Sequence, residues 1–223
     1  HRATVPAGEI LRPGSTGRVE ENSALLRART RGVVVDQSAI ERFQMAGQDL
    51  PHLIDQWVEA QPDTPLFVWE PRDGTVASWT YREFRDDTLR IAAGLLARGV
   101  SLGDRVLIHA DNCPEMVLAW YACARIGAVG VTTNTRSVAN EVAYFAEHTK
   151  AVGAITQPQY AELVRDAAPQ LEWLVVTDDD SGEAPSATVP SGCDPWQSLY
   201  GDAESVPARP ADPMLPVGVM FTS

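Results

Sequence analysis

Apolar residues begin to recur at regular spacing near Leu50. The first patterned segment places four apolar side chains on one helical face: Leu53, Ile54, Trp57 and Val58. Pro62 then ends this helix. Two short strands are predicted at residues 66–69 and 76–79, because the Asp73-Gly74 pair between these apolar runs is typical of a tight turn.

A second helix is predicted between Thr80 and Gly99. Thr80-Tyr81-Arg82-Glu83 matches a capping box, in which the threonine hydroxyl accepts a helix-start N–H and the glutamate reaches back. The inner face is predicted from side chains that recur at three- and four-residue spacing: Phe84, Thr88, Ile91, Leu95 and Leu96. Gly99 fits the end of the helix, where a left-handed backbone is common.

Strands and helices alternate over the rest of the chain. Short apolar runs predict strands at residues 105–110, 128–133, 151–156, 173–177 and 217–221. Helical patterns lie between them at residues 115–126, 138–148 and 160–168. Helices that connect short apolar strands indicate right-handed βαβ units. The predicted fold class is therefore α/β, with a largely parallel sheet and helices on both faces.

Local signals also predict the two ends of one of these helices and the inner face of another. Asn112 and Glu115 can cap the helix over residues 115–126, and Gly127 suits its C-terminal end. The inner face of the helix over residues 138–148 is predicted to carry Val138, Val142 and Phe145.

Residues 1–44 differ from the rest of the chain. They are rich in Arg, Gly and Pro, and most of them show neither helical nor strand periodicity. Met45 precedes the first patterned segment and is taken to lie near the natural start. We therefore expect residues 1–44 to be a disordered tail or an upstream extension, and residues 45–223 to form one incomplete domain.

The composition excludes several kinds of partner. Apolar residues make up 44% of the 223, which supports a real core. The formal net charge is −12 and no Lys/Arg cluster stands out, so a nucleic-acid or anionic-membrane surface is not expected. No apolar run approaches the roughly 20 residues of a membrane helix. We expect no membrane span.

Cysteine and histidine positions give no metal site. Cys113, Cys123 and Cys193 form an odd set without CxxC spacing, which argues against a zinc site or a disulfide framework and favours a cytoplasmic location. Three of the four histidines, His52, His109 and His148, are scattered without ligand spacing. Surface or structural roles are expected for them.

The sequence contains no GxGxxG, complete Walker loop or GxSxG motif, so no residue is assigned a catalytic role. The informative feature is the order of shorter motifs. They are Ser78–Glu83, Gly99-Val100, Gly103–Val106, Asp111–Glu115, Arg125–Val129, Asn134–Arg136, Asp212-Pro213 and Val219–Ser223. Over residues 50 to 223 this succession resembles the N-terminal region of the adenylate-forming (AMP-binding) superfamily. The residues of these motifs most closely resemble those of acyl-CoA synthetases of the crotonobetaine/carnitine-CoA ligase type.

The resemblance implies the chemistry of an acid–CoA ligase. Such an enzyme joins a carboxylic acid to coenzyme A through an acyl-adenylate, using ATP and Mg²⁺. In the superfamily, a Thr-Ser pair opens a Gly/Thr/Ser-rich loop that ends in lysine and holds the ATP phosphates. Thr222 and Ser223 are therefore expected to contact ATP, and the chain is expected to stop where that phosphate loop begins.

Asn134 and Arg136 are further binding candidates. They follow the carboxyl end of a predicted parallel strand, the edge where ligands of open α/β sheets gather. The planar guanidinium of Arg136 could meet a carboxylate or a phosphate. Alternatively, both residues brace the loop against a neighbouring helix.

Two other functions are considered. One is an adenylation domain that loads a carrier protein, and the other is a stand-alone Rossmann-like binding module. If the ligase interpretation holds, the family places most of the catalytic apparatus after Ser223. The 223-residue chain is then expected neither to adenylate acids nor to bind ATP tightly.

Overall fold

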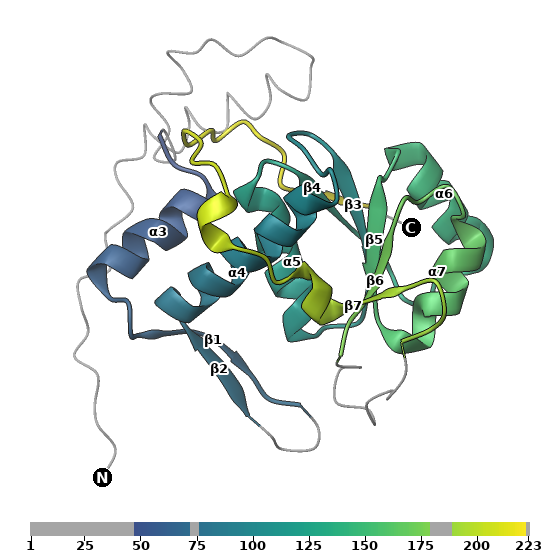
Figure 1. Ribbon diagram of the computed structural model, residues 1–223, viewed down its shortest axis with the longest axis horizontal. Helices are drawn as coiled ribbons and strands as arrows, with labels where there is room; N and C mark the ends of the chain where they lie inside the picture. Colours follow the sequence, from purple (N-terminus) through teal and green to yellow (C-terminus); the bar gives the residue numbers. More distant parts are fainter. Residues whose placement is uncertain (1–46, 72–75, 179–188, 222–223) are drawn as a thin grey trace, which may run out of the picture. The chain divides into compact units, whose positions relative to one another are not determined.

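A six-stranded parallel sheet forms the centre of the fold. The computed structural model describes residues 47–71, 76–178 and 189–221 (Figure 1). All the elements below belong to the unit Gln48–Ser223. The sheet has the strand order β7-β6-β5-β3-β4-β8. Its strands are β3 (Arg105–His109), β4 (Val129–Thr132), β5 (Gly153–Thr156), β6 (Leu174–Val176), β7 (Asp194–Pro195) and β8 (Gly218–Met220).

Helices cover both faces of this sheet. The α-helices are α3 (Leu50–Ala60), α4 (Tyr81–Ala97), α5 (Pro114–Arg125), α6 (Ala139–Thr149) and α7 (Ala161–Ala167). Three short 3-10 helices are η1 (Pro158–Tyr160), η2 (Trp196–Leu199) and η3 (Ala203–Ser205). In Figure 1, α6 and α7 lie on one side of the sheet and α4 and α5 on the other. The α/β class predicted from the alternating pattern is confirmed.

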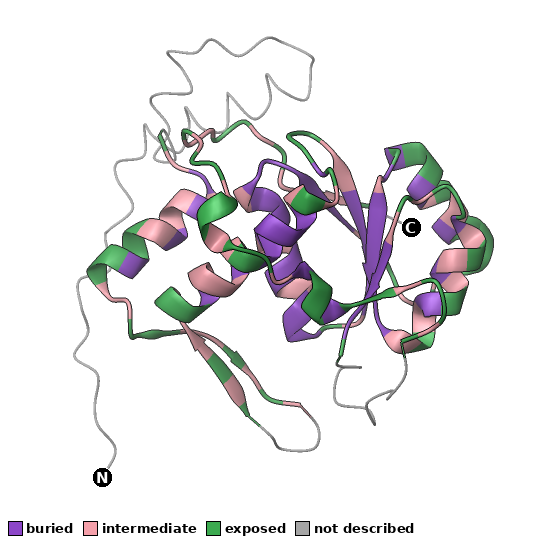
Figure 2. Ribbon diagram, viewed as in Figure 1, coloured by how far each residue is buried: buried purple, intermediate pink, exposed green. Residues whose placement is uncertain are grey.

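The two faces of β3 enter two separate cores. Val106 and Ile108 pack in the core that includes α3, α4 and α5, whereas Leu107 packs in the core that includes α6 and α7. Since successive strand side chains point to opposite faces, a strand buried on both faces needs a continuous apolar run. Figure 2 shows the central strands buried over most of their length.

A separate two-stranded antiparallel sheet packs beside α4. It consists of β1 (Pro65–Trp69) and β2 (Ala77–Thr80), so both predicted strands are present. The ring of Phe67 stacks on Trp79 at 5.3 Å and meets Phe84 of α4 edge-on at 6.4 Å. The predicted turn pair between the strands lies outside the described residues.

The capping box of α4 is confirmed. The N–H of Glu83 donates to Oγ1 of Thr80 at 3.2 Å, and the N–H of Thr80 donates to Oε2 of Glu83 at 2.9 Å. At the other end, Gly99 has the left-handed φ of +84° that the sequence predicted for this position.

Two local predictions were wrong. The N-cap of α5 is Cys113 and makes no side-chain capping bond, while Asn112 is exposed. Val138 is 58% exposed because it precedes α6 as its N-cap and does not lie on the inner face of the helix. Trp57 is 42% exposed at the edge of α3, where its ring stacks on Tyr81.

Candidate functional site

Four neighbouring strands end at one edge of the sheet. β5, β3, β4 and β8 are parallel and adjacent, so their carboxyl ends point the same way. The loops that leave this edge begin at residues 110, 133 and 157, and β8 delivers the chain to the same edge at Phe221. Ligands of open α/β sheets bind at such an edge. Both sets of residues predicted to bind a ligand follow strands that end here.

Thr222 and Ser223 lie outside the described residues. The residue before them, Phe221, packs against α6. The ring of Phe221 packs on Phe145 of α6 at 4.3 Å and lies 6.0 Å from Tyr144. Four residues earlier, before β8 begins, the carbonyl of Val217 accepts the indole N–H of Trp120 at 2.7 Å. These contacts hold β8 on both sides of its pairing with β4.

Asn134 and Arg136 stand in the loop after β4, and both are exposed. Oδ1 of Asn134 accepts the backbone N–H of Arg136 at 2.9 Å, so the asparagine shapes its own loop. Within the described part of the chain, the guanidinium of Arg136 makes no hydrogen bond or ion pair. The alternative that Arg136 braces the loop against a helix therefore has no supporting contact there.

The carboxylate of Asp111, the first residue of the Asp111–Glu115 motif, joins the loops of this edge. Oδ1 of Asp111 accepts the hydroxyl of Thr135 at 2.5 Å, and Oδ2 accepts the hydroxyl of Tyr160 at 2.6 Å. Burial raises the pKa of Tyr160, and its hydrogen bond to Asp111 raises it further. Tyr160 is therefore a protonated donor at neutral pH. The sequence placed Asp111 in the succession of motifs and directly after a buried strand, but gave it no binding role.

His109 forms the buried floor of the same edge. Its side chain is fully buried, and Nδ1 lies 2.8 Å from Oγ1 of Thr133. The imidazole meets the ring of Tyr160 edge-on at 5.3 Å. Burial lowers the pKa of His109, with the negative charge of Asp111 acting in the opposite direction. The side chain is thus neutral at pH 7.

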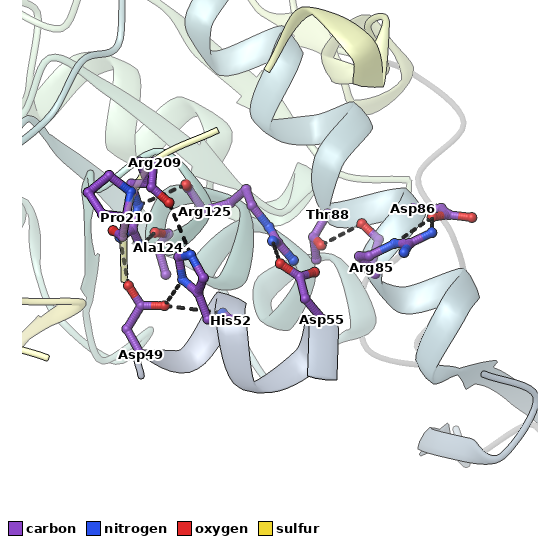
Figure 3. A network of polar contacts seen from close by, with 10 residues as sticks. All are labelled: Asp49, His52, Asp55, Arg85, Asp86, Thr88, Ala124, Arg125, Arg209 and Pro210. Atoms are coloured by element: carbon purple, nitrogen blue, oxygen red, sulfur yellow. Dashed lines mark hydrogen bonds and ion pairs between the residues drawn. The ribbon is translucent and has the colours of Figure 1, made fainter. Parts of the chain in front are cut away.

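A second polar network lies at the opposite ends of the strands, around α3 and the C-terminal end of α5 (Figure 3). Asp49 caps α3 through the N–H of His52 at 3.1 Å and also accepts from Nη1 of Arg209 at 2.6 Å. Arg209 donates in addition to the carbonyls of Ala124 and Arg125. The network ties three segments together, which is a structural task.

A 470 Å³ cavity adjoins this network between α3, α4 and the segment after η3. Asp55 and Arg125 line it and form an ion pair at 2.6 Å. Glu59, Arg85 and Glu204 add further charges of both signs. With its charges paired or mixed in sign, the cavity gives no basis for choosing a ligand, and it lies away from the carboxyl edge of the sheet.

Two kinds of feature were not found among the described residues. No group of three or more His, Cys, Asp or Glu side chains in these ranges could hold a metal ion. None of the helices described is long and apolar enough to cross a membrane.

The parallel sheet has helices on both faces and polar loops at its carboxyl edge. This arrangement is that of the open α/β folds, whose ligands bind at that edge. Residues 54–223 match the family model described as "AMP-binding enzyme". The chain belongs to this family, as the ordered motifs predicted.

Named relatives agree with this assignment. Over 138 residues, 60% of this chain, the sequence is 29% identical to the crotonobetaine/carnitine–CoA ligase of Escherichia coli. A fatty acyl CoA synthetase from Mycobacterium tuberculosis has a TM-score of 0.62 at 24% identity, covering 78% of this chain and 32% of that one. An acetoacetyl-CoA synthetase from Streptomyces lividans has a TM-score of 0.62 at 22% identity, covering 77% of this chain and 28% of that one. The two structures show a shared fold.

The matched region is only a part of each relative. It spans 27% of the Escherichia coli ligase and about a third or less of the two solved structures.

Proposed function

We propose that the chain is the N-terminal part of an ATP-dependent acid–CoA ligase. The family match supports this, and so do the relatives, which carry the names of CoA ligases and synthetases. The observation that carries the proposal is the placement of Phe221. β8 brings the chain to the carboxyl edge beside β4, immediately before the Thr222-Ser223 pair.

The proposed reaction has two steps. The carboxylate attacks the α-phosphorus of ATP, which forms the acyl-adenylate and releases pyrophosphate. The thiol of coenzyme A then attacks the acyl carbon and AMP leaves. A free carboxylate is a poor acyl donor because oxide is a poor leaving group, and adenylation replaces oxide with AMP. Stabilising the charge on the transferring phosphorus is the main catalytic demand.

Our proposal assigns binding, not catalysis, to the residues of this chain. Thr222 and Ser223 begin the loop whose N–H and hydroxyl groups hold the ATP phosphates, since phosphate oxygens require several converging donors. Arg136 and Asn134 present donors from the neighbouring loop, and the exposed guanidinium suits an anionic oxygen. The described residues offer Mg²⁺ no set of ligands, so no step is assigned to the metal.

Domain limits and location belong to the same proposal. Residues 45–223 would be an incomplete AMP-binding domain, with residues 1–44 as a tail or upstream extension. The cysteine pattern favours a cytoplasmic enzyme. The acyl acceptor is taken to be coenzyme A because the named relatives are CoA ligases.

Two measurements on the 223-residue chain test its proposed incompleteness. We expect no acid-dependent ATP–pyrophosphate exchange, and calorimetry with ATP should show no tight binding. Exchange above the background of a boiled sample would contradict the proposal that the chain is inactive alone. Tight nucleotide binding without exchange would favour the stand-alone binding module.

A further inference from the structure

Asp111 connects three loops at the carboxyl edge of the sheet. It lies in the β3–α5 loop, and its two carboxylate oxygens accept from Thr135 of the β4–α6 loop and Tyr160 of η1, at 2.5 and 2.6 Å. Its own N–H donates to Oε1 of Gln157 at 2.8 Å. Each carboxylate oxygen therefore serves a different loop. The loops are joined through hydrogen bonds to one side chain.

The loop held through Thr135 is the one that carries Arg136. Around Thr135, the N–H of Arg136 donates to Oδ1 of Asn134 at 2.9 Å, and the N–H of Ser137 donates to the carbonyl of Asn134 at 3.0 Å. These bonds shape the turn but attach it to nothing outside the loop. The hydroxyl of Thr135 connects the turn, through Asp111, to the β3–α5 loop and to η1. The side chain of Arg136 stays exposed.

We propose that Asp111 is a positioning residue, which holds the β4–α6 loop so that Arg136 is oriented to bind an anionic phosphate group. The inference rests on the anion-binding role of Arg136 in the proposed function. Fixing the backbone of a residue costs conformational entropy, and a ligand that must order its own binding loop binds more weakly. Asp111 orders the loop before the ligand arrives.

The arrangement requires hydroxyl donors, not a nearby positive charge. Both partners of the carboxylate are neutral hydroxyl groups, so Asp111 does not use the guanidinium of Arg136 as an ion-pair partner. A neutral tether leaves that guanidinium available to an external anion. Removing one hydroxyl therefore tests the tether without altering any charge.

The test uses inorganic pyrophosphate as the probe and the whole 223-residue chain. Pyrophosphate is titrated into isotope-labelled protein, and the amide signals of residues 134–137 report its affinity. Thr135→Val removes the hydroxyl but keeps the shape, and we expect about tenfold weaker binding, the effect of leaving roughly one residue to be ordered on binding. Tyr160→Phe should weaken binding in the same direction. Thr135→Ser, which restores the hydroxyl, should recover the wild-type affinity.

Thr149→Val is the matched control. It removes a hydroxyl that donates to the carbonyl of Phe145 at 2.7 Å, at the far end of α6. We expect this variant to lose stability but to bind pyrophosphate like the wild type. Equal weakening by Thr149→Val and Thr135→Val would overturn the positioning role, because a general loss of stability would then explain both.

Arg136→Ala separates the two proposals. If it abolishes the signal changes while Thr135→Val and Tyr160→Phe bind like the wild type, Asp111 does not position the loop and the anion contact stands. If the wild type shows no saturable change, or Arg136→Ala binds equally well, the anion-binding role of Arg136 is wrong and the positioning role falls with it.

Discussion

At the residue scale, Asp49 joins the start of α3 to a segment 160 residues later in the chain. The side chains of Asp49 and Arg209 are only 6% and 17% exposed. Burial alone would raise the pKa of Asp49, but hydrogen bonds from His52, the N–H of Asp212 and Arg209 lower it below its ordinary value. A buried carboxylate held by several donors stabilises the fold only while it remains ionised and partnered.

Removing one partner of the Asp49–Arg209 ion pair should lower the stability of the fold. Arg209→Met keeps the aliphatic stem but leaves Asp49 without its cationic partner, and we expect a loss of about 3 kcal/mol in the free energy of unfolding at pH 7. Urea denaturation of the variant and the wild type measures this difference in the free energy of unfolding. The control is Arg82→Met, because Arg82 and Asp63 lie 3.6 Å apart with side chains 50% and 85% exposed. That change should cost less than about 0.5 kcal/mol, and equal costs for the two variants would contradict the role given to burial.

The same carboxylate predicts a pH dependence. Because the pKa of Asp49 is lower in the folded state than in the unfolded chain, its contribution is fully present above the unfolded value. That contribution is lost as the pH falls through the folded value. The stability difference between wild type and Asp49→Asn should therefore shrink as the pH falls from 7 to below about 4. A difference that stays constant over this range would show that the charge contributes nothing.

At the element scale, β8 is the strand on which the proposed nucleotide site depends. It pairs with β4 over three residues, Gly218 to Met220. Space for Trp120 beside it depends on glycine, since a Cβ on Gly130 would lie 2.4 Å from the indole and one on Gly218 would lie 3.1 Å away. The indole occupies this space and donates to Val217. The half-buried side chain of Trp120 from α5 thus helps to fix this short strand.

Trp120→Phe tests that anchor. The smaller ring keeps most of the apolar surface but loses the N–H donor, and we expect a loss of about 1 kcal/mol in stability. Amide hydrogen exchange should become faster in β8 more than in β3. Trp57→Phe, at an exposed position, serves as the control and should change neither. Unchanged exchange in β8 of the Trp120 variant would show that the indole N–H does not hold the strand.

Elements whose signals are local in the sequence were predicted well. The Thr80–Glu83 capping box involves residues three apart, so its pattern is visible in the sequence. The buried strands were visible as continuous apolar runs such as residues 105–110. Val138 was placed wrongly because the helical spacing of apolar residues continues to the residue before the first turn of α6 without a change in pattern. Boundaries depend on which N–H finds a partner, here the N–H of Val138 with Glu141.

At the scale of the whole molecule, the contacts that sequence reasoning missed join distant segments. Asp111 meets Thr135 and Tyr160, which lie 24 and 49 residues away. No local spacing encodes such a cluster, because the order of strands in the sheet decides which loops become neighbours. The candidate site was predictable only as an edge of the sheet and through a resemblance to a family. Its positioning contacts required the fold.

The central claim is that these residues form the first part of an acid–CoA ligase. Its most direct test is acyl-CoA formation by the protein extended beyond Ser223 to the length of its relatives, assayed against a panel of carboxylic acids with the 223-residue chain as control. We expect AMP release that requires ATP, a carboxylic acid and coenzyme A in the extended protein, and none in the control. AMP release by the 223-residue chain, or no acid-dependent AMP release by the extended protein with any acid, would contradict it.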